Sequence, residues 1–432
     1  MKTMKYIISS LLLLFYINVT AQQTPAPKQT TDYSIEGAIA HLGNGKVIEN
    51  SLIMFSKGKI KFVGSANSKI ARLGEVIDAK GKHVYPGFIA SNSSLGLVEV
   101  NAVRASNDQD ELGDLIPHVR SLIAYNAESK VVESMRPNGI LLGQISPKGG
   151  RISGTSSVVQ FDAWNWEDAA VKVDDGIHVN WPDNFSRGKF WLGEDPNLKP
   201  NSNYNKQIDE LKTFFNESKT HLSSSSSVTN LPFLAVNGLF NGSQKLYIHV
   251  NDEKGIIDAV ALKVALNIKY LVIVGGYQAN KAIDLLKEHN VAILLNHTHS
   301  LPNSDDDDYD LPFKLPKLLS DAGILVGIQN GAASNFQTRN LPFYAGQVVA
   351  QGLDKEDALK LISSNTAKIL GIDADYGTLE VDKSATLFIS EGDALDMRTN
   401  ILTEAFIQGR KISLETHQTK LWKRYSKKYS SQ

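Results

Sequence analysis

One stretch of 28 residues constrains the fold more than any other part of the chain. It reads "KYLVIVGG" (269–276), "YQANKAIDLLKEHN" (277–290) and "VAILLN" (291–296). The two apolar runs have the length of buried strands, and the segment between them has the periodicity of an amphipathic helix. A strand, a helix and a second strand this close in sequence predict a parallel strand pair, because the helix returns the chain across the sheet.

Short apolar strands alternate with helical stretches along the whole centre of the chain. This alternation is typical of an α/β protein in which helices cover a parallel sheet. Eight parallel strands predict a closed (β/α)8 TIM-type barrel, whose chemistry lies at the carboxyl ends of the strands. An open doubly wound sheet is the alternative fold. The eight predicted strands are 83–90, 139–146, 156–162, 177–181, 245–250, 269–274, 291–297 and 324–329.

The two ends of the chain differ from the centre in their pattern of apolar and turn residues. Residues 33–85 and 377–414 contain short strands separated by turns rich in Gly, Asn and Lys. We therefore predict that they pair with each other into one small composite β-sandwich domain. The barrel then occupies residues 86–376, and residues 415–432 form a C-terminal tail. Residues 22–32 contain Pro and Gln without an apolar pattern, which predicts a flexible leader.

Residues 1–21 have the order of a cleavable export signal. Lys2 and Lys5 precede an apolar block that ends at Val19, and Ala21 supplies a small residue for cleavage. We expect the mature protein in the periplasm or outside the cell, without a membrane span, because no apolar block is long enough. The chain has no Cys, which excludes disulfides and thiol nucleophiles. A net charge of −1 with well-mixed signs gives no indication of a nucleic-acid or membrane-surface partner.

Several separated motifs occur in a fixed order along the chain. They are "GKHVYPGFI" (81–89), "RNLPFYAGQVVAQGLDKEDALKLISSNTAKILGI" (339–372), "YGTLEVDKSATLFI" (376–389) and "FIQGRKI" (406–412). With these motifs the sequence resembles the metal-dependent amidohydrolase superfamily, in particular its imidazolonepropionase-like secreted members. The resemblance implies a barrel with a composite β-domain. It also implies hydrolysis of C–N bonds other than peptide bonds by water bound to Zn²⁺ or a similar ion.

The resemblance implies metal ligands that this sequence largely lacks. The family places a His-x-His pair after the first strand, a His on the fifth and an Asp that serves as base on the eighth. Here Asn92 and Ser94 stand at the His pair, His249 keeps the fifth-strand position, and Asn330, beside Gln329, stands at the catalytic base. Neutral amides and hydroxyls are weak ligands for Zn²⁺, and Asn cannot act as a base. We therefore expect no standard metal centre and no cofactor.

Metal-ligand residue types gather at one further place, "LLNHTHSLPNSDDDDYD" (294–310). His297 and His299 are two residues apart at the end of the seventh predicted strand, so extended backbone points both to one face. Together with His249 they form a candidate relocated site for one Zn²⁺ or similar ion. The alternative interpretation is a solvated acidic loop with two polar His side chains.

Other polar residues are candidates for binding a small molecule in the barrel mouth. Asn92 and Ser94 can donate and accept hydrogen bonds there. Arg151 and Arg339 are candidates for gripping a carboxylate, since a guanidinium offers two donors, although surface ion pairs are the alternative. The segment "SPKGGRISGTSSVV" (146–159) is dense in Gly and Ser, which favours a turn over the barrel mouth rather than an anion-binding loop.

Two functions of different class follow from these residues. The first is a degenerate member of the superfamily that has lost the standard metal centre. It would bind a small molecule in the barrel mouth, form a homo-oligomer or pair with an intact homologue. The second is an active hydrolase of non-peptide C–N bonds, such as those of cyclic amides, with an altered metal site. We favour the first function, because most of the implied ligand positions are substituted.

Overall fold

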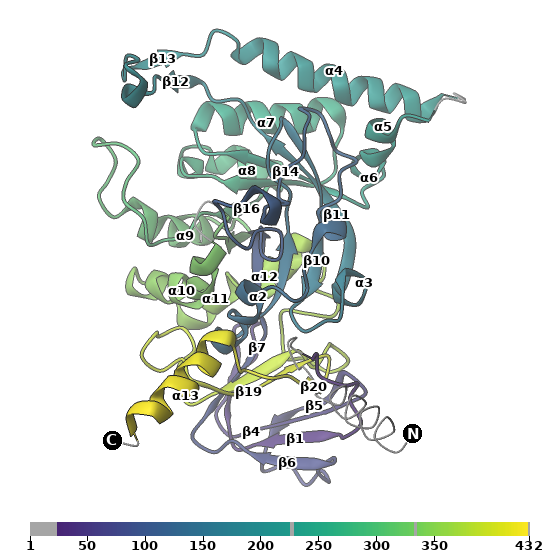
Figure 1. Cartoon of the computed structure of the whole chain (residues 1–432), viewed down its shortest axis with the longest axis vertical. Coiled ribbons are helices and arrows are strands. Elements are labelled where there is room, and N and C mark those ends of the chain that lie inside the picture. Colours follow the sequence, from purple (N-terminus) through teal and green to yellow (C-terminus); the bar gives the residue numbers. More distant parts are fainter. Residues whose placement is uncertain (1–23, 225–228, 332–334, 431–432) are drawn as a thin grey trace, which may run out of the picture.

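The computed structural model describes residues 24–224, 229–331 and 335–430 (Figure 1). The predicted export signal, residues 1–21, lies outside the described residues. A barrel occupies the centre of the molecule, with two smaller sheets below it in the view of Figure 1. The long helix α4 (Tyr204–Ser223) lies above the barrel, and the last helix, α13 (His417–Ser430), projects from the junction with the lower sheets.

The central sheet has eight strands and closes on itself. Its strand order is β17-β16-β15-β14-β11-β10-β9-β8, and a parallel bridge between Ser91 and Gln329 joins the first strand to the last. Every predicted strand overlaps one of these strands, so the predicted (β/α)8 TIM-type barrel is confirmed and the open sheet is excluded. The strands are β8 (Phe88–Ser93), β9 (Ile140–Ile145), β10 (Ile152–Gln160), β11 (Ala170–Asn180), β14 (Lys245–Val250), β15 (Leu271–Gly275), β16 (Ala292–Leu295) and β17 (Val326–Ile328).

One barrel strand runs against the others, which corrects the prediction of eight parallel strands. β10 is antiparallel to both of its neighbours, β9 and β11, whereas the remaining pairs in the barrel are parallel. Only six residues, 146–151, connect β9 to β10. A connection this short suits a hairpin, since a parallel return needs a dozen residues or more. The reversal therefore places this connection at the carboxyl ends of the neighbouring strands.

The predicted first strand, 83–90, is divided between two sheets. β7 (His83–Pro86) pairs with the lower domain, and the barrel strand β8 begins at Phe88. Gly87 lies at the division, where its N–H donates to Thr386 O (2.9 Å). A Cβ at this position would stand only 2.9 Å from Thr386 Cγ2, so the close approach of the two domains requires glycine.

Helices cover the outside of the barrel, and a large apolar cluster lies between them and the strands. It contains Leu246 and Ile248 of β14 together with Ile256 of α7 (Glu253–Leu266). The side chain of Asp252 caps the first turn of α7 by accepting a hydrogen bond from Gly255 N (2.8 Å). The other helices are α2 (Lys130–Glu133), α3 (Trp166–Ala169), α5 (Leu231–Ala235), α6 (Asn237–Asn241), α8 (Ile283–Glu288), α9 (Leu311–Asp321), α10 (Leu341–Ala350), α11 (Lys355–Lys360) and α12 (Ser364–Leu370).

The inside of the barrel is apolar at one end and polar at the other. A second apolar cluster contains strand residues such as Leu142 and Tyr247, together with Ile369 of α12. Gln144 and His178 are buried as well, although they are polar. Buried polar groups need hydrogen-bond partners, which can include those of a ligand. The polar end is therefore the candidate location for a binding site.

Below the barrel, both ends of the chain contribute to the same sheet. β7 pairs antiparallel with β18, which lies more than 300 residues later in the chain. The six-stranded sheet has the order β20-β19-β18-β7-β2-β3, and the four-stranded sheet has the order β5-β4-β1-β6. An apolar cluster that includes Ile35, Phe55, Leu387 and Phe406 joins them. The strands are β1 (Tyr33–Glu36), β2 (Ile39–His41), β3 (Val47–Ile48), β4 (Ser51–Ser56), β5 (Lys59–Ser65), β6 (Glu75–Asp78), β18 (Leu387–Ser390), β19 (Leu402–Ile407) and β20 (Arg410–Lys411).

The segment predicted as a flexible leader, 22–32, is hydrogen-bonded to the body over its described part, residues 24–32. Ala26 N donates to Asp162 Oδ2 (2.9 Å), and Arg410 Nη1 donates to Ala26 O (3.0 Å). Gln29 Oε1 accepts from Gly58 N (2.7 Å). These contacts need no apolar periodicity, because they are made by backbone groups and a polar side chain.

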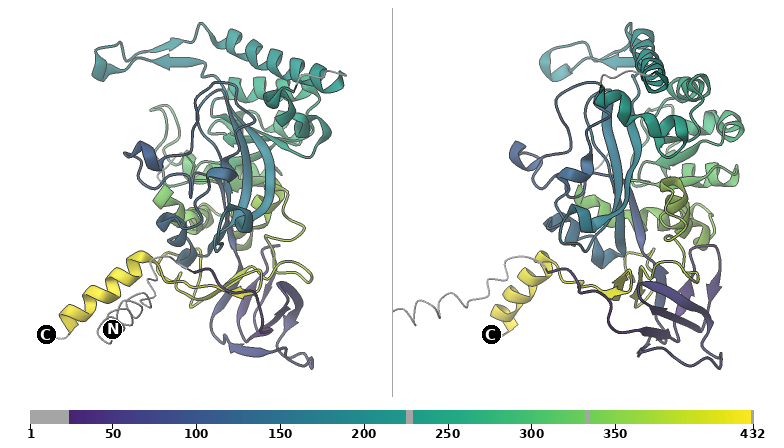
Figure 2. Two further views of the ribbon diagram at one scale, coloured as in Figure 1. Left: turned by 45° about the vertical axis from the view of Figure 1, so that its right-hand side comes forward. Right: turned by 90° about the vertical axis from the view of Figure 1, so that its right-hand side faces the viewer.

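Two parts of the chain extend away from the body. The hairpin of β12 (Phe185–Arg187) and β13 (Leu198–Pro200) projects at one end, and α13 projects at the other (Figure 2). None of the helices within the described residues is long and apolar enough to cross a membrane.

Candidate functional site

A cavity of about 170 Å³ opens at the carboxyl ends of the barrel strands. Its lining includes four side-chain amides, one ammonium, one imidazole and one carboxylate. The position agrees with the general location of active sites in this type of barrel. The lining residues are Asn92, Lys148, Trp181, Asp183, His249, Val250, Asn251, Val274, Gly275, Asn296, Gln329 and Gly331.

Lys148 reaches the cavity because of the reversed strand. It belongs to the β9–β10 connection, in which Gly149 (φ 79°) and Gly150 (φ 56°) adopt left-handed conformations. Asn180 Nδ2 fastens this connection by donating to Gly150 O (2.7 Å). Lys148 Nζ donates to Asn92 Oδ1 (3.2 Å), and burial lowers the pKa of Lys148 to about 8. The predicted turn over the barrel mouth is therefore present, and it carries a buried amine.

Two imidazoles lie in contact beside this amine. His178 of β11 and His249 of β14 are joined by a hydrogen bond between Nδ1 and Nε2 (2.9 Å). Burial lowers the pKa of both rings, that of His249 to about 3, and the positive charge of Lys148 acts in the same direction. Both rings are consequently neutral near pH 7, so one donates the shared proton and the other accepts it. Nε2 of His178 is buried without a hydrogen-bond partner, and Nδ1 of His249, whose ring lines the cavity, is the nitrogen of that ring left for a ligand.

A buried carboxylate, Asp175, lies at the centre of a hydrogen-bond network next to the imidazole pair. Asp175 accepts hydrogen bonds from Gln144 Nε2 (2.9 Å), Ser156 Oγ (2.7 Å) and Tyr247 Oη (2.8 Å). Burial raises the pKa of Asp175, whereas these donors oppose the increase. Tyr247 also stacks on His178, with ring centroids 4.7 Å apart. Tyr247 therefore links the Asp175 network to the imidazole pair through the ring of His178.

The last residues of the first barrel strand, β8, form several hydrogen bonds within the protein. Asn92 has a left-handed backbone (φ 48°), and its N–H donates to Gln144 Oε1 (3.0 Å). Its side chain donates to Gln329 Oε1 (3.1 Å) and accepts from Lys148. A Cβ at Gly331 would stand 2.3 Å from Asn92 O, so the two segments touch where the barrel closes.

The other predicted binding residues lie in different surroundings. Ser94 Oγ donates to Asn335 Oδ1 (2.6 Å), and Asn330 Nδ2 donates to Thr338 Oγ1 (3.4 Å). Neither Ser94 nor Asn330 lines the cavity, whereas Gln329, the neighbour of Asn330, does. Arg151 Nη1 donates to Asn180 O (2.8 Å), and Arg339 is exposed.

His297 and His299 lie against a different partner from that of His249. Both rings contact Tyr344, with centroids 5.4 and 5.0 Å away. His297 lines a separate small cavity of about 20 Å³. Across residues 24–224, 229–331 and 335–430, no group of three or more His, Asp or Glu side chains is arranged to hold a metal ion. The relocated ligand set stays a prediction, to be tested by measuring metal content.

The residues in the barrel mouth do not fit the metal centre that the resemblance implies. Its first ligand position is Asn92, which binds an ammonium group through the oxygen that would face an ion. Nε2 of His249 is hydrogen-bonded to Nδ1 of His178 and is therefore not available to bind an ion. A fixed positive charge repels a divalent cation, and amides are weak ligands for Zn²⁺. The barrel mouth is therefore poorly suited to a divalent cation.

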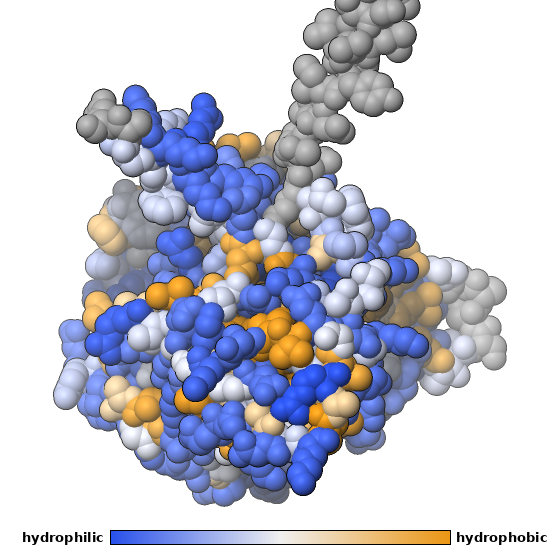
Figure 3. Space-filling view, turned by 90° about the horizontal axis from the view of Figure 1, so that it is seen from below, coloured by the Kyte–Doolittle hydropathy of each residue, from blue (hydrophilic) through white to orange (hydrophobic). Residues whose placement is uncertain are grey.

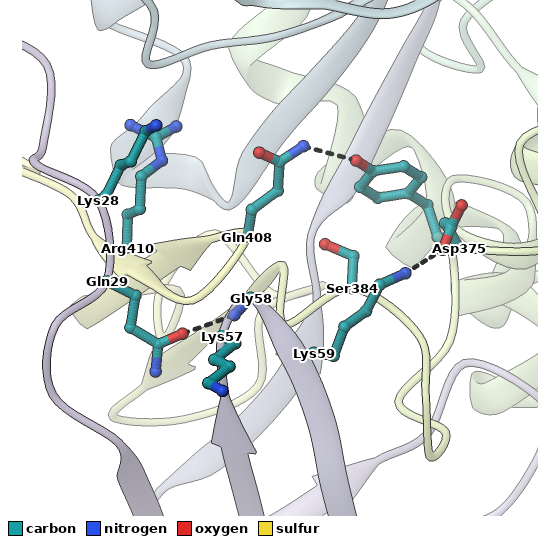
Figure 4. Close-up of a pocket in the computed structure, with 10 residues that line it drawn as sticks. Lys28, Gln29, Lys57, Gly58, Lys59, Asp375, Ser384, Gln408 and Arg410 are labelled. Atoms are coloured by element: carbon teal, nitrogen blue, oxygen red, sulfur yellow. Dashed lines mark hydrogen bonds and ion pairs between the residues drawn. The ribbon is translucent and has the colours of Figure 1, made fainter.

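A second cavity, of about 450 Å³, lies beside the lower domain (Figure 4). It contains four cationic side chains, of which two belong to ion pairs. Arg410 pairs with Asp162 (2.9 Å), and Lys59 pairs with Asp375. Gln408 Nε2 donates to Tyr376 Oη (2.9 Å) across the same cavity. The cationic residues are Lys28, Lys57, Lys59 and Arg410.

Comparisons with known proteins identify the fold. No protein-family model matches the sequence, and no curated protein matches it. Among solved structures, an amidohydrolase from Thermotoga maritima has a TM-score of 0.76 with 20% identity, over 88% of this chain and 99% of that one. A Xaa-Pro dipeptidase with bound methionine gives 0.54 and 12%, over 88% and 99% of the two chains.

A zinc-bound adenosine deaminase from Xanthomonas campestris gives a TM-score of 0.53 with 15% identity, over 89% of this chain and 93% of that one. At these identities the likeness establishes the amidohydrolase fold and nothing finer. The coverage of the Thermotoga structure extends over the barrel and the additional sheet domain.

Several residues of the site carry little signal in the sequence. Lys148 lies in the Gly-rich segment 146–159. The composition of this segment predicts a turn or a loop of backbone N–H donors and gives no indication of a role for the lysine side chain. Asp175 precedes a predicted strand and Tyr247 lies inside another, where a lone polar residue is not distinctive. Their common role becomes visible only when four strands, β9, β10, β11 and β14, are placed side by side, because the hydrogen-bond partners are far apart in sequence.

Proposed function

We propose that this protein binds a small anionic metabolite in the barrel mouth without using a metal. The observation that carries the proposal is the Lys148 amine, which lies in the cavity against Asn92 and forms no ion pair with a described carboxylate. A buried charge is costly unless it is compensated, so an anionic ligand would stabilise it. His249 and the amides of Asn251 and Asn296 can hydrogen-bond the rest of such a ligand.

The ligand class follows from these groups. Lys148 favours a carboxylate, and the surrounding amides favour a neighbouring amide or urea group. The purified protein should therefore bind N-acetylglycine or N-carbamoylglycine in isothermal titration. It should not bind N-acetylglycinamide, which has a similar shape without the charge.

A substitution tests the role of the amine. Lys148→Met should weaken carboxylate binding by about tenfold or more, because it removes a charge-assisted hydrogen bond. Lys57→Met is the matched control, since this lysine lies in the second cavity. Equal affinity for the charged and neutral ligands, or unchanged affinity in Lys148→Met, would contradict the proposal.

A second candidate function is hydrolysis of small non-peptide C–N bonds at an altered metal site. It is favoured by the fold, which a solved amidohydrolase shares. It requires bound metal at His249, His297 and His299. Elemental analysis of the purified protein should find stoichiometric metal that His297→Ala removes; metal-free protein would end this candidate. Pairing with an intact homologue, or with another copy, is tested by measuring the mass in solution.

A further inference from the structure

The last helix buries none of its own side chains, although the segment before it is firmly attached. Thr416 is buried, and His417 N donates to Glu133 Oε1 (2.6 Å) at the start of the helix. The helix therefore leaves the body from a fixed root and extends outward (Figures 1 and 2).

The side chains of α13 are divided between two faces. The larger apolar and aromatic side chains fall within an arc of roughly 100° when successive residues are turned by the helical repeat. All of them are exposed, by 37% to 69%. They are Leu421, Trp422, Tyr425 and Tyr429.

The rest of the helix surface is largely cationic. Five basic residues lie outside the apolar arc, spread over roughly 140°, and the helix itself contains no acidic residue. Glu415, just before the helix, pairs with Lys423 (2.9 Å) and lies 3.9 Å from Lys420. Seen from below, the helix stands out as a largely hydrophilic arm (Figure 3). The basic residues are Lys420, Lys423, Arg424, Lys427 and Lys428.

We propose that α13 docks on the surface of an anionic lipid bilayer. A helix with a basic face and a Trp- and Tyr-bearing face lies in the plane of a membrane interface. Its 14 residues are too short to span a bilayer, so the helix would rest on the surface. The proposal is independent of the ligand in the barrel mouth.

The combination of residue types on α13 favours a bilayer over a protein groove. Protein interfaces also take Trp and Tyr as anchors, so the basic residues beside them are the deciding feature, and α13 offers a single aliphatic anchor, Leu421. Its other members have rings with a polar edge, which suit the boundary between headgroups and acyl chains. The five cations match the negative potential of an anionic membrane.

Vesicle flotation tests the proposal with the full chain. The protein should float with vesicles containing phosphatidylglycerol, and much less with vesicles of phosphatidylcholine alone. The triple variant Trp422→Ser, Tyr425→Ser, Tyr429→Ser should reduce binding by about tenfold or more. Lys420→Gln with Lys423→Gln and Lys427→Gln should abolish the preference for anionic vesicles.

A matched control removes exposed aromatic residues elsewhere. Phe190 and Trp191, in the β12–β13 hairpin, are 68% and 67% exposed, and Phe190→Ser with Trp191→Ser should leave flotation unchanged. The N-terminal apolar segment is common to all variants, so differences between them report α13. Unchanged flotation of the triple variant, or equal loss in the hairpin control, would overturn the proposal. Self-association that the triple variant abolishes, without flotation, would overturn it as well and assign the face to a second copy.

Discussion

Two cavities of this protein differ in how their cationic side chains are compensated, since two of the four cations in the lower cavity have a carboxylate partner and the one cation of the barrel mouth has none among the described residues. In the lower cavity Arg410 is neutralised by Asp162, and Lys59 by Asp375. In the barrel mouth Lys148 donates to the amide oxygen of Asn92 and pairs with no carboxylate among the described residues. The two named charges of the larger cavity are therefore satisfied, whereas the smaller cavity contains a charge that a ligand could still compensate.

The largest expected effect on stability concerns Asp162, the carboxylate that pairs with Arg410 of the lower cavity. Asp162 accepts from Arg136 Nη1 (3.0 Å) and Arg410 Nη1 (2.9 Å), and burial lowers the pKa of Arg136. Asp162→Ala would leave two guanidinium groups without their carboxylate, at a cost of about 3 to 5 kcal/mol. Urea unfolding followed by circular dichroism measures this loss. An unchanged midpoint would show that these charges are compensated in another way.

The next effect is the pH dependence that Lys148 contributes. Its pKa of about 8 in the folded protein lies below the usual 10.5, so the unfolded chain binds the additional proton between these values. Stability contributed by this group therefore rises with pH across that window, by up to about 3 kcal/mol. Lys148→Met should lose this rise, and Lys57→Met should keep it. If the free energy of unfolding depends on pH in the same way in the wild type and in Lys148→Met, the lowered pKa of Lys148 is contradicted.

The smallest effect belongs to the exposed ion pair of the lower cavity. Lys59 and Asp375 are 42% and 52% exposed, and such pairs contribute less than about 1 kcal/mol. Lys59→Met should shift the unfolding midpoint only slightly, and the shift should shrink further in high salt. A larger loss would mean that this cavity depends on its charges as strongly as the barrel mouth does.

Hydrophobic periodicity was enough to predict the barrel, its approximate strand positions and the pairing of the two chain ends. Periodicity reports these features because it reflects which face of each element is buried. Asn92 and Ser94 were also candidates from the sequence, and of the two Asn92 lines the cavity. The reversal of β10 was missed because a strand has the same pattern in either direction, and the short connection between the predicted strands 139–146 and 156–162 was the available signal.

The contents of the barrel mouth depend on contacts that form only in the folded chain. The reversal of β10 brings Lys148 to Asn92, 56 residues away in sequence, and strand pairing brings His178 to His249. Burial then sets the charge of each group: neutral imidazoles and an amine with a lowered pKa. These properties depend on neighbours and on the exclusion of water, which no local pattern of residues encodes.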